Sequence, residues 1–296
     1  MWLLETSTFQ LRQFYGRDVP PYAILSHTWG PDEVTFDDMQ SVDLSFVRIK
    51  AGFQKIQRCC DQALIHGYEY AWVDSCCIDK KSSAELTEAI NSMFKFYGNS
   101  SLCYAYLDDV PDWDITRPFP DEQFAQSRWF TRGWTLQELV APQNILFYSE
   151  HWSLLEHAIS AFHEKLSSIT WIPMRVLEYP QYIFSESVAR RMVLASNRET
   201  TREEDIAYCL MGLFNVNMPI LYGEGRKNAF KRLQYEIIRS SPDHTIFTWR
   251  NSEPNSGLIA ADPKDFSECH GMASIEAYDS AAYTISLGYG LVRCAA

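Results

Sequence analysis

Residues 70–110 read YAWVDSCCIDKKSSAELTEAINSMFKFYGNSSLCYAYLDDV, and this stretch decides the fold. It begins with a short apolar run at 70–73, continues with apolar residues at helical spacing, and ends with a second apolar run at 102–107. Ser82 or Ser83 can cap the helix at its start, and Gly98 can end it. A strand, a helix and a strand in this order predict a parallel pair joined by a right-handed crossover.

The segments on either side extend the same alternation. An apolar run at 22–25 (YAIL) predicts an earlier strand, and residues 43–66 predict a helix with Gly67 at its C-terminal end. After residue 110, the segment WFTRGWTLQELVA predicts a helix and residues 145–148 predict a further strand. The alternation therefore predicts an α/β fold with a mostly parallel sheet and helices on both faces.

The remainder of the chain has a different pattern, and we expect three parts: an α/β core at 1–150, a helical part at 151–243 and a β-rich extension at 244–296. In the helical part, Thr201 and Glu204 have the spacing of a capping box, and Gly225 precedes a basic helix at 226–239. In the extension, HTIFTWR and AAYTISLGYGLVR alternate apolar and polar residues, which predicts strands.

Composition restricts the class of protein. The 296 residues are 46% hydrophobic, enough for a substantial core, and 38 acidic against 26 basic residues give a net charge of −12. A surplus of acid argues against a nucleic-acid partner. Apolar stretches such as 206–214 are too short to span a bilayer, and the first residues lack the features of a secretory signal, so we expect a cytoplasmic protein without a membrane span.

The eight cysteines give no sign of a metal centre or of a disulfide framework. They include two adjacent pairs and no C-x-x-C, so we expect free, buried, reduced thiols and no metal site. The cysteines are at positions 59, 60, 76, 77, 103, 209, 269 and 294.

Polar residues follow the predicted strands, where ligands of open α/β sheets bind. The first strand ends in a loop with Gly and Pro, and three of the four strand ends carry carboxylates, namely Asp74, Asp108 with Asp109, and Glu150. The candidate binding residues at this edge are Ser26, His27, Thr28, Trp29, Gly30 and Asp74.

A second candidate feature is RGWTLQEL at 132–139, where Trp134 and Glu138 are four residues apart on one helical face. Either Trp134 is the wall of a pocket and Glu138 is a catalytic carboxylate, or Trp134 belongs to the core and Glu138 has a structural role. The order of elements puts the start of this helix at the same edge of the sheet as the 26–30 loop. An open Glu138 would favour catalysis, and a Glu138 sealed in the core by an arginine would favour a structural role.

The chain resembles the heterokaryon incompatibility (HET) domain across about residues 20–250. The resemblance is carried by YAILSHTWG (22–30), the 70–110 stretch, SRWFTRGWTLQELVAP (127–142) and the segment 187–238. It implies a role in self/non-self recognition and programmed cell death of filamentous fungi. The 187–238 segment is similar to members in which the domain precedes an NTPase and repeat region, so we expect a signalling partner or fused region of this NACHT/STAND type. Because this chain ends at 296 without one, we expect a stand-alone member or a piece of a longer chain.

A weaker resemblance links HET domains to TIR domains, which implies a TIR- or flavodoxin-like sheet and cleavage of NAD at its nicotinamide–ribosyl bond. Residues 134–139 match the TIR form W-C-L-x-E-L except for Thr135. The resemblance makes Glu138 the catalytic residue, Trp134 a pocket wall and the 26–30 loop the nucleotide-binding loop, with Arg132 available for a phosphate. No second basic clamp is visible. NAD would be a substrate, with no bound cofactor.

Two alternatives remain open. The chain could be a non-catalytic, death-inducing module that acts by self-association, with Trp134 in the core and Glu138 anchoring the fold through backbone groups or Arg132. It could also be a cysteine hydrolase built on Cys76 or Cys77, although neither has a histidine in the same motif.

Overall fold

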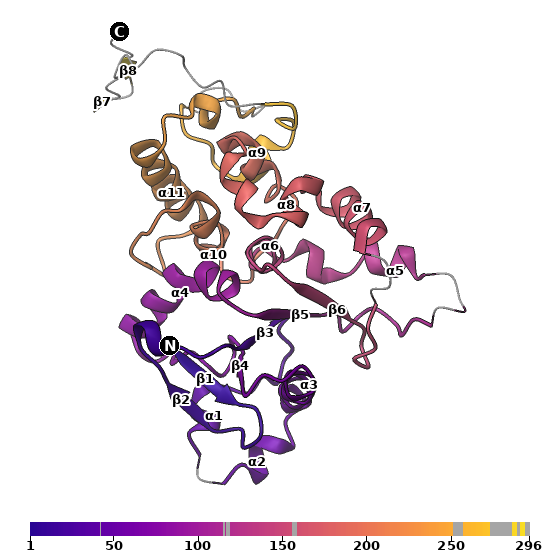
Figure 1. The fold of residues 1–296 in the computed structure, drawn as a ribbon. Helices are drawn as coiled ribbons and strands as arrows, with labels where there is room; N and C mark the ends of the chain where they lie inside the picture. The colour runs from indigo at the N-terminus through magenta and orange to yellow at the C-terminus, as the bar shows by residue number, and fades with distance from the viewer. Residues whose placement is uncertain are drawn as a thin grey trace.

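The computed structural model describes residues 1–41, 43–114, 116, 119–155, 159–250 and 257–272. Beyond residue 272 it describes only the backbone of residues 286–288 and 291–293. One mixed sheet of six strands, in the order β2-β1-β4-β3-β5-β6, lies beneath a larger helical part (Figure 1). Its strands are β1 (Trp2–Glu5), β2 (Leu11–Gln13), β3 (Ala23–His27), β4 (Tyr70–Trp72), β5 (Leu102–Tyr106) and β6 (Ile145–Tyr148).

The helices of the first half of the chain connect or flank these strands. They are α1 (Phe36–Met39), α2 (Ser45–Arg48), α3 (Ala51–Ile65), α4 (Ser83–Gly98), α5 (Asp121–Ala125) and α6 (Thr135–Val140), with 3-10 turns η1 (Gly16–Asp18) and η2 (Arg128–Thr131). The second half contains α7 (Ile159–Thr170), α8 (Met174–Glu178), α9 (Val188–Val193), α10 (Asp205–Tyr208) and α11 (Arg226–Ser240), with η3 (Pro180–Ser185), η4 (Gly212–Phe214), η5 (His244–Phe247) and η6 (Pro263–Phe266).

The predicted α/β fold is confirmed. Strands β4, β3, β5 and β6 pair in parallel, and their order is that of flavodoxin-like sheets. The chain moves one way from β3 to β4 and the opposite way through β5 to β6, so right-handed crossovers place α3 on one face and α4 and α6 on the other (Figure 1). The antiparallel hairpin of β1 and β2, which extends the sheet beyond β4, was not predicted because its strands are too short to show a period.

The 70–110 stretch folds as its pattern predicts. The hydroxyl of Ser82 accepts a hydrogen bond from the backbone N–H of Glu85 and caps α4. On the buried face of α4, Tyr97 donates from its hydroxyl to the carbonyl of Leu25 at 2.9 Å, which fixes the helix against β3.

Two predicted helices are broken. The 43–66 segment divides into α2 and α3 at Lys50, whose backbone is extended, because Asp32 accepts a hydrogen bond from the N–H of Ala51. The WFTRGWTLQELVA segment divides into η2 and α6 at Gly133, whose N–H donates to the carbonyl of Glu199 at 2.8 Å. At Gly133 a Cβ would lie 2.5 Å from Thr200, so only glycine allows this approach.

The second half is mainly helical, and α11 confirms the predicted basic helix. The predicted capping box is wrong: Glu204 instead accepts hydrogen bonds from the N–H groups of Gly223 and Gly225. In the tail, residues 244–247 form η5 where a strand was predicted, because the side chain of Asp243 caps that turn. Of AAYTISLGYGLVR, the described part forms the antiparallel strands β7 (Ser286–Gly288) and β8 (Leu291–Arg293), and the rest lies outside the described residues. The division into three parts stays a prediction.

The contact between α4 and η4 joins the two halves and can be tested with glycine substitutions. A Cβ on Gly212 would lie 2.2 Å from Cβ of Phe94, whereas one on Gly98 would meet only the carbonyl of Ala141 at an ordinary 3.5 Å. We expect Gly212→Ala to lower the free energy of unfolding by about 1–3 kcal/mol through overpacking, and Gly98→Ala to change it by less than about 1 kcal/mol. Urea denaturation measures both, and equal effects would contradict the close contact.

Candidate functional site

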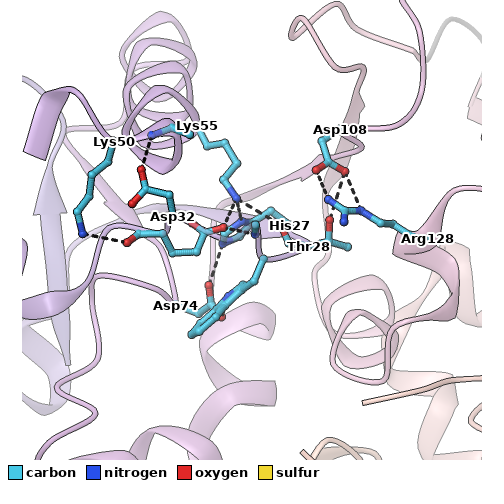
Figure 2. A network of polar contacts seen from close by, with 12 residues as sticks. His27, Thr28, Asp32, Lys50, Lys55, Asp74, Asp108 and Arg128 are labelled. Atoms are coloured by element: carbon cyan, nitrogen blue, oxygen red, sulfur yellow. Dashed lines mark hydrogen bonds and ion pairs between the residues drawn. The ribbon is translucent and has the colours of Figure 1, made fainter. Parts of the chain in front are cut away.

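The carboxyl end of β3 is tied to the carboxyl end of β4 by a hydrogen-bonded cluster (Figure 2). His27 lies between Asp74 and Lys55, with its ring nitrogens 2.9 Å from Oδ1 of Asp74 and 2.9 Å from Nζ of Lys55. The indole N–H of Trp29 donates to the other oxygen of Asp74 at 2.8 Å. Burial opposes ionisation of Asp74, but the hydrogen bond from His27 and the charges of His27 and Lys80 outweigh it and lower the pKa of Asp74.

Three cationic side chains lie around the 26–30 loop. None of them was predicted from the sequence, where only Arg132 was expected to bind a phosphate. Nζ of Lys80 lies 3.7 Å from the ring centroid of Trp29, and burial lowers the pKa of that lysine. Lys55 pairs with Glu33, and Arg128 pairs with Asp108 at the end of β5. Lys80 could have been found in the sequence, six residues after Asp74, whereas Lys55 and Arg128 reach the loop only through the tertiary fold.

The backbone of the loop is also held internally. The hydroxyl of Thr28 donates to Asp108 at 3.3 Å, which links β3 to β5 across the point where the strand order reverses (Figure 2). The N–H of Gly30 donates to Oε1 of Glu33 at 2.6 Å. A ligand phosphate would therefore compete with Glu33 for the Gly30 amide.

Glu138 lies beneath this loop and is 5% exposed. The hydroxyl of Ser26 donates to Oε2 of Glu138 at 2.5 Å, and the indole N–H of Trp129 donates to the Ser26 oxygen at 2.9 Å. Burial, followed by the charge of Asp74, raises the pKa of Glu138 to about 8, although the hydrogen bond from Ser26 acts in the opposite direction. At pH 7 this carboxyl group is mostly protonated. Trp129, which was not among the predicted site residues, completes the cluster.

The arginine that would seal Glu138 does not bond to it. Arg198 is buried, and its guanidinium donates to the carbonyls of Leu194 and Arg132 and to the hydroxyl of Thr135. Its charge acts on Glu138 through space, which favours the ionised carboxylate. The site is therefore closed to solvent in this structure, but the direct hydrogen-bond partner of Glu138 is a residue of the loop-bearing strand.

Arg132 and Trp134 point elsewhere. Nη2 of Arg132 donates to the hydroxyl of Thr201 at 2.7 Å, and the indole N–H of Trp134 donates to Oδ2 of Asp205 at 3.1 Å. The structure thus brings Glu138 together with Ser26 and places Arg132 and Trp134 against the helical part. Helical spacing alone could not show this, because Trp134 is the N-cap residue of α6 and its partner Asp205 is 71 residues away in the sequence.

The cysteines are unsuited to nucleophilic catalysis. Cys76 and Cys77 are buried in the turn after β4, and a hydrogen bond with Cys77 together with burial raises the pKa of the Cys76 thiol. The seven cysteines of the described residues are free and buried, and Cys294 lies outside them. In the same part of the chain, no group of three or more His, Cys, Asp or Glu side chains could hold a metal ion, and no helix is long and apolar enough to cross a membrane.

The fold and this edge define the class: an α/β domain with flavodoxin-like strand order and a charged, closed site at its switch point. Residues 22–114 match the family described as Heterokaryon incompatibility protein (HET), and residues 228–286 match a domain of unknown function (DUF8212). The chain is 43% identical over 231 residues to Vegetative incompatibility protein HET-E-1 of Podospora anserina. This chain belongs to the HET-domain family.

The matched region covers 74% of this chain and 16% of the Podospora protein, so the chain spans about a sixth of that relative's length. No solved structure matches the chain.

The buried carboxyl group predicts a pH dependence of stability. Burial raises the pKa of Glu138 from 4.5 to about 8, so folded protein retains a proton that unfolded protein loses. This contribution is complete below about pH 4.5 and is lost as the pH rises through about 8, at about 1.4 kcal/mol per pH unit in between. We expect the melting temperature of the wild type, relative to Glu138→Gln, to fall steadily from pH 5 to pH 8. Calorimetry of both proteins tests this, and parallel profiles would contradict a neutral, buried Glu138.

Proposed function

We propose that this chain acts in heterokaryon incompatibility, and that it does so as a cytoplasmic effector that cleaves NAD and so triggers cell death. Membership of the HET family and the name of the Podospora relative support the first part. The resemblance of residues 134–139 to the catalytic motif of TIR enzymes supports the second.

One observation carries the enzymatic proposal: Ser26 donates to Glu138 at 2.5 Å. This hydrogen bond places the carboxyl group of the motif glutamate against β3, one residue before the strand ends at the switch point. In open α/β sheets this is the position where nucleotides bind. Trp29, 46% exposed and stacked on Lys80, offers a flat ring and a cation beside it, which suit a base and a phosphate.

The reaction breaks the bond between C1′ of the ribose and the nicotinamide nitrogen, and water adds at C1′ to give ADP-ribose, nicotinamide and a proton. The ribosyl centre becomes cationic in the transition state, so an ionised Glu138 stabilises it electrostatically. Because Glu138 is closed off and mostly protonated, the 26–30 loop must move to admit substrate. The approach of the cationic nicotinamide ring then favours loss of the proton from Glu138.

A second candidate function is a non-catalytic module that acts by self-association. The observation that favours it is the burial of Glu138. Ser26 donates to Glu138 and accepts from Trp129, so these two hydrogen bonds link β3, η2 and α6 as a structural anchor would. In either case the partners would be further copies of the chain and a NACHT/STAND-type region, in the same chain or separate.

The deciding experiment measures nicotinamide release from NAD by wild-type protein, Glu138→Gln and the control Glu236→Gln. Glu236 lies on α11 and pairs with Arg239, far along the chain from the candidate site. We expect Glu138→Gln to lower turnover at least a hundredfold and Glu236→Gln to leave it within twofold. Wild-type kcat/KM should rise with pH, with its midpoint near pH 8, because the ionised form is active.

The assay should be run from dilute protein to high concentration with a crowding agent, while light scattering records the oligomeric state. Absence of turnover at every concentration, with concentration-dependent assembly, would reject the enzyme in favour of the module. Equal turnover by Glu138→Gln at matched melting temperature would remove Glu138 from the mechanism.

A further inference from the structure

A groove runs along α4 at the edge of the sheet opposite the candidate site. It consists of two cavities, of about 300 Å³ and about 580 Å³, that share Lys95 and Asn99 as lining residues. We call it the α4 groove. One end is formed by the first residues of the chain, which lie beside α4, and the other by η3 and η4 of the helical part (Figure 1).

The α4 groove is separate from the site of Glu138. Its lining includes Tyr22, Ser101 and Gln143, which precede β3, β5 and β6, whereas His27, Asp74 and Asp108 follow the carboxyl ends of their strands. The five residues of β3 span roughly 16 Å between the two edges. A ligand in the groove therefore would not be part of the nucleotide proposed above.

The smaller cavity is lined by side-chain amides. Five of them are exposed and make no hydrogen bond among the described residues, those of Asn99, Gln143, Gln181, Asn215 and Asn217. A sixth amide, that of Asn91, accepts from the backbone N–H of Met218 at 3.1 Å and donates to its carbonyl at 3.2 Å. This wall thus already pairs one amide with both backbone polar groups of one residue, and the remaining amides can do the same for another chain.

The larger cavity offers apolar contacts. Met1, Phe14 and Val19 line it from the N-terminal segment, and Phe96 lines it from α4. Hydrophobic and aromatic linings of this kind receive an apolar side chain. The two cavities together fit a ligand that has a polar backbone for the smaller cavity and an apolar side chain for the larger one.

The charges of the groove fix a third property of the ligand. Lys95 is exposed at the shared wall and has no ion pair among the residues that the structure describes. Glu88, seven residues earlier and thus roughly 10 Å along α4, lines the larger cavity. An acidic group is attracted to Lys95 and repelled from the Glu88 end.

We propose that the α4 groove binds an extended peptide segment of a partner protein, with an apolar side chain in the larger cavity and an Asp or Glu beside Lys95. The amides of the smaller cavity hold the peptide backbone. This is recognition of a protein, separate from catalysis, and it gives the HET domain a second surface through which a partner can act on it.

The test begins with selection of a random 12-residue phage-displayed peptide library on the full chain. Enriched peptides are synthesised and measured by fluorescence anisotropy against wild type, Lys95→Glu, Gln143→Ala and the control Lys227→Glu. Lys227 is an exposed lysine of α11 that forms no ion pair among the described residues. We expect enriched sequences to place an acidic residue near an apolar one. Lys95→Glu should weaken binding at least tenfold, Gln143→Ala at least threefold and Lys227→Glu less than twofold.

Melting curves check that each variant is folded, and Lys95→Gln replaces Lys95→Glu if the latter melts early. Glu138→Gln should bind the peptides as wild type does, so failure of the NAD assay leaves this proposal standing and the reverse also holds. Three results would overturn it: no enriched pattern, enriched peptides that bind Lys95→Glu unchanged, or binding of neutral oligosaccharides such as maltohexaose that Gln143→Ala weakens while peptides do not bind.

Discussion

The buried hydrogen bond between Ser26 and Glu138 is the interaction on which the α/β half depends. An acidic side chain this deep in a protein is tolerated only when it is neutral or well paired, and here it is both protonated and bonded to a hydroxyl. The indole N–H of Trp129 donates to one lone pair of the Ser26 oxygen, so strand β3, turn η2 and helix α6 meet at one serine oxygen. Replacing Ser26 by an apolar residue would remove this hydrogen-bond partner from both Glu138 and the buried indole N–H of Trp129.

The cations around the 26–30 loop gather at one place in a chain whose net charge is −12. Lys55, Lys80 and Arg128 each stand beside a carboxylate, so the local charge is nearly balanced although the whole chain is acidic. Balanced pairs of this kind hold the loop closed at little net cost. An incoming phosphate would replace a carboxylate as the partner of one of these cations. The phosphate would then compete with the carboxylate when the loop opens, and no cation would be left desolvated without a partner.

Much of the fold could be predicted because each parallel strand is a buried apolar run and each crossover helix has a full apolar face. The hairpin of β1 and β2 could not, since three or four residues carry no readable period. The breaks at Lys50 and Gly133 depend on Asp32 and Glu199, which approach from distant parts of the chain. The same limit applied to the site: Ser26 and Glu138 were both candidates, but their hydrogen bond spans 112 residues of sequence.

Helix α4 lies beside both the candidate site and the α4 groove. The hydroxyl of its residue Tyr97 donates to the carbonyl of Leu25, the residue before Ser26, which is the hydrogen-bond partner of Glu138. Lys95 and Asn99, on the neighbouring turns of the same helix, line the α4 groove at the opposite edge of the sheet. The backbone hydrogen bonds of α4 resist local bending, so the helix is a rigid element between the two surfaces. A peptide seated against Lys95 would therefore leave the packing of Tyr97 on β3 unchanged, which keeps the proposed recognition surface independent of the closed carboxyl group.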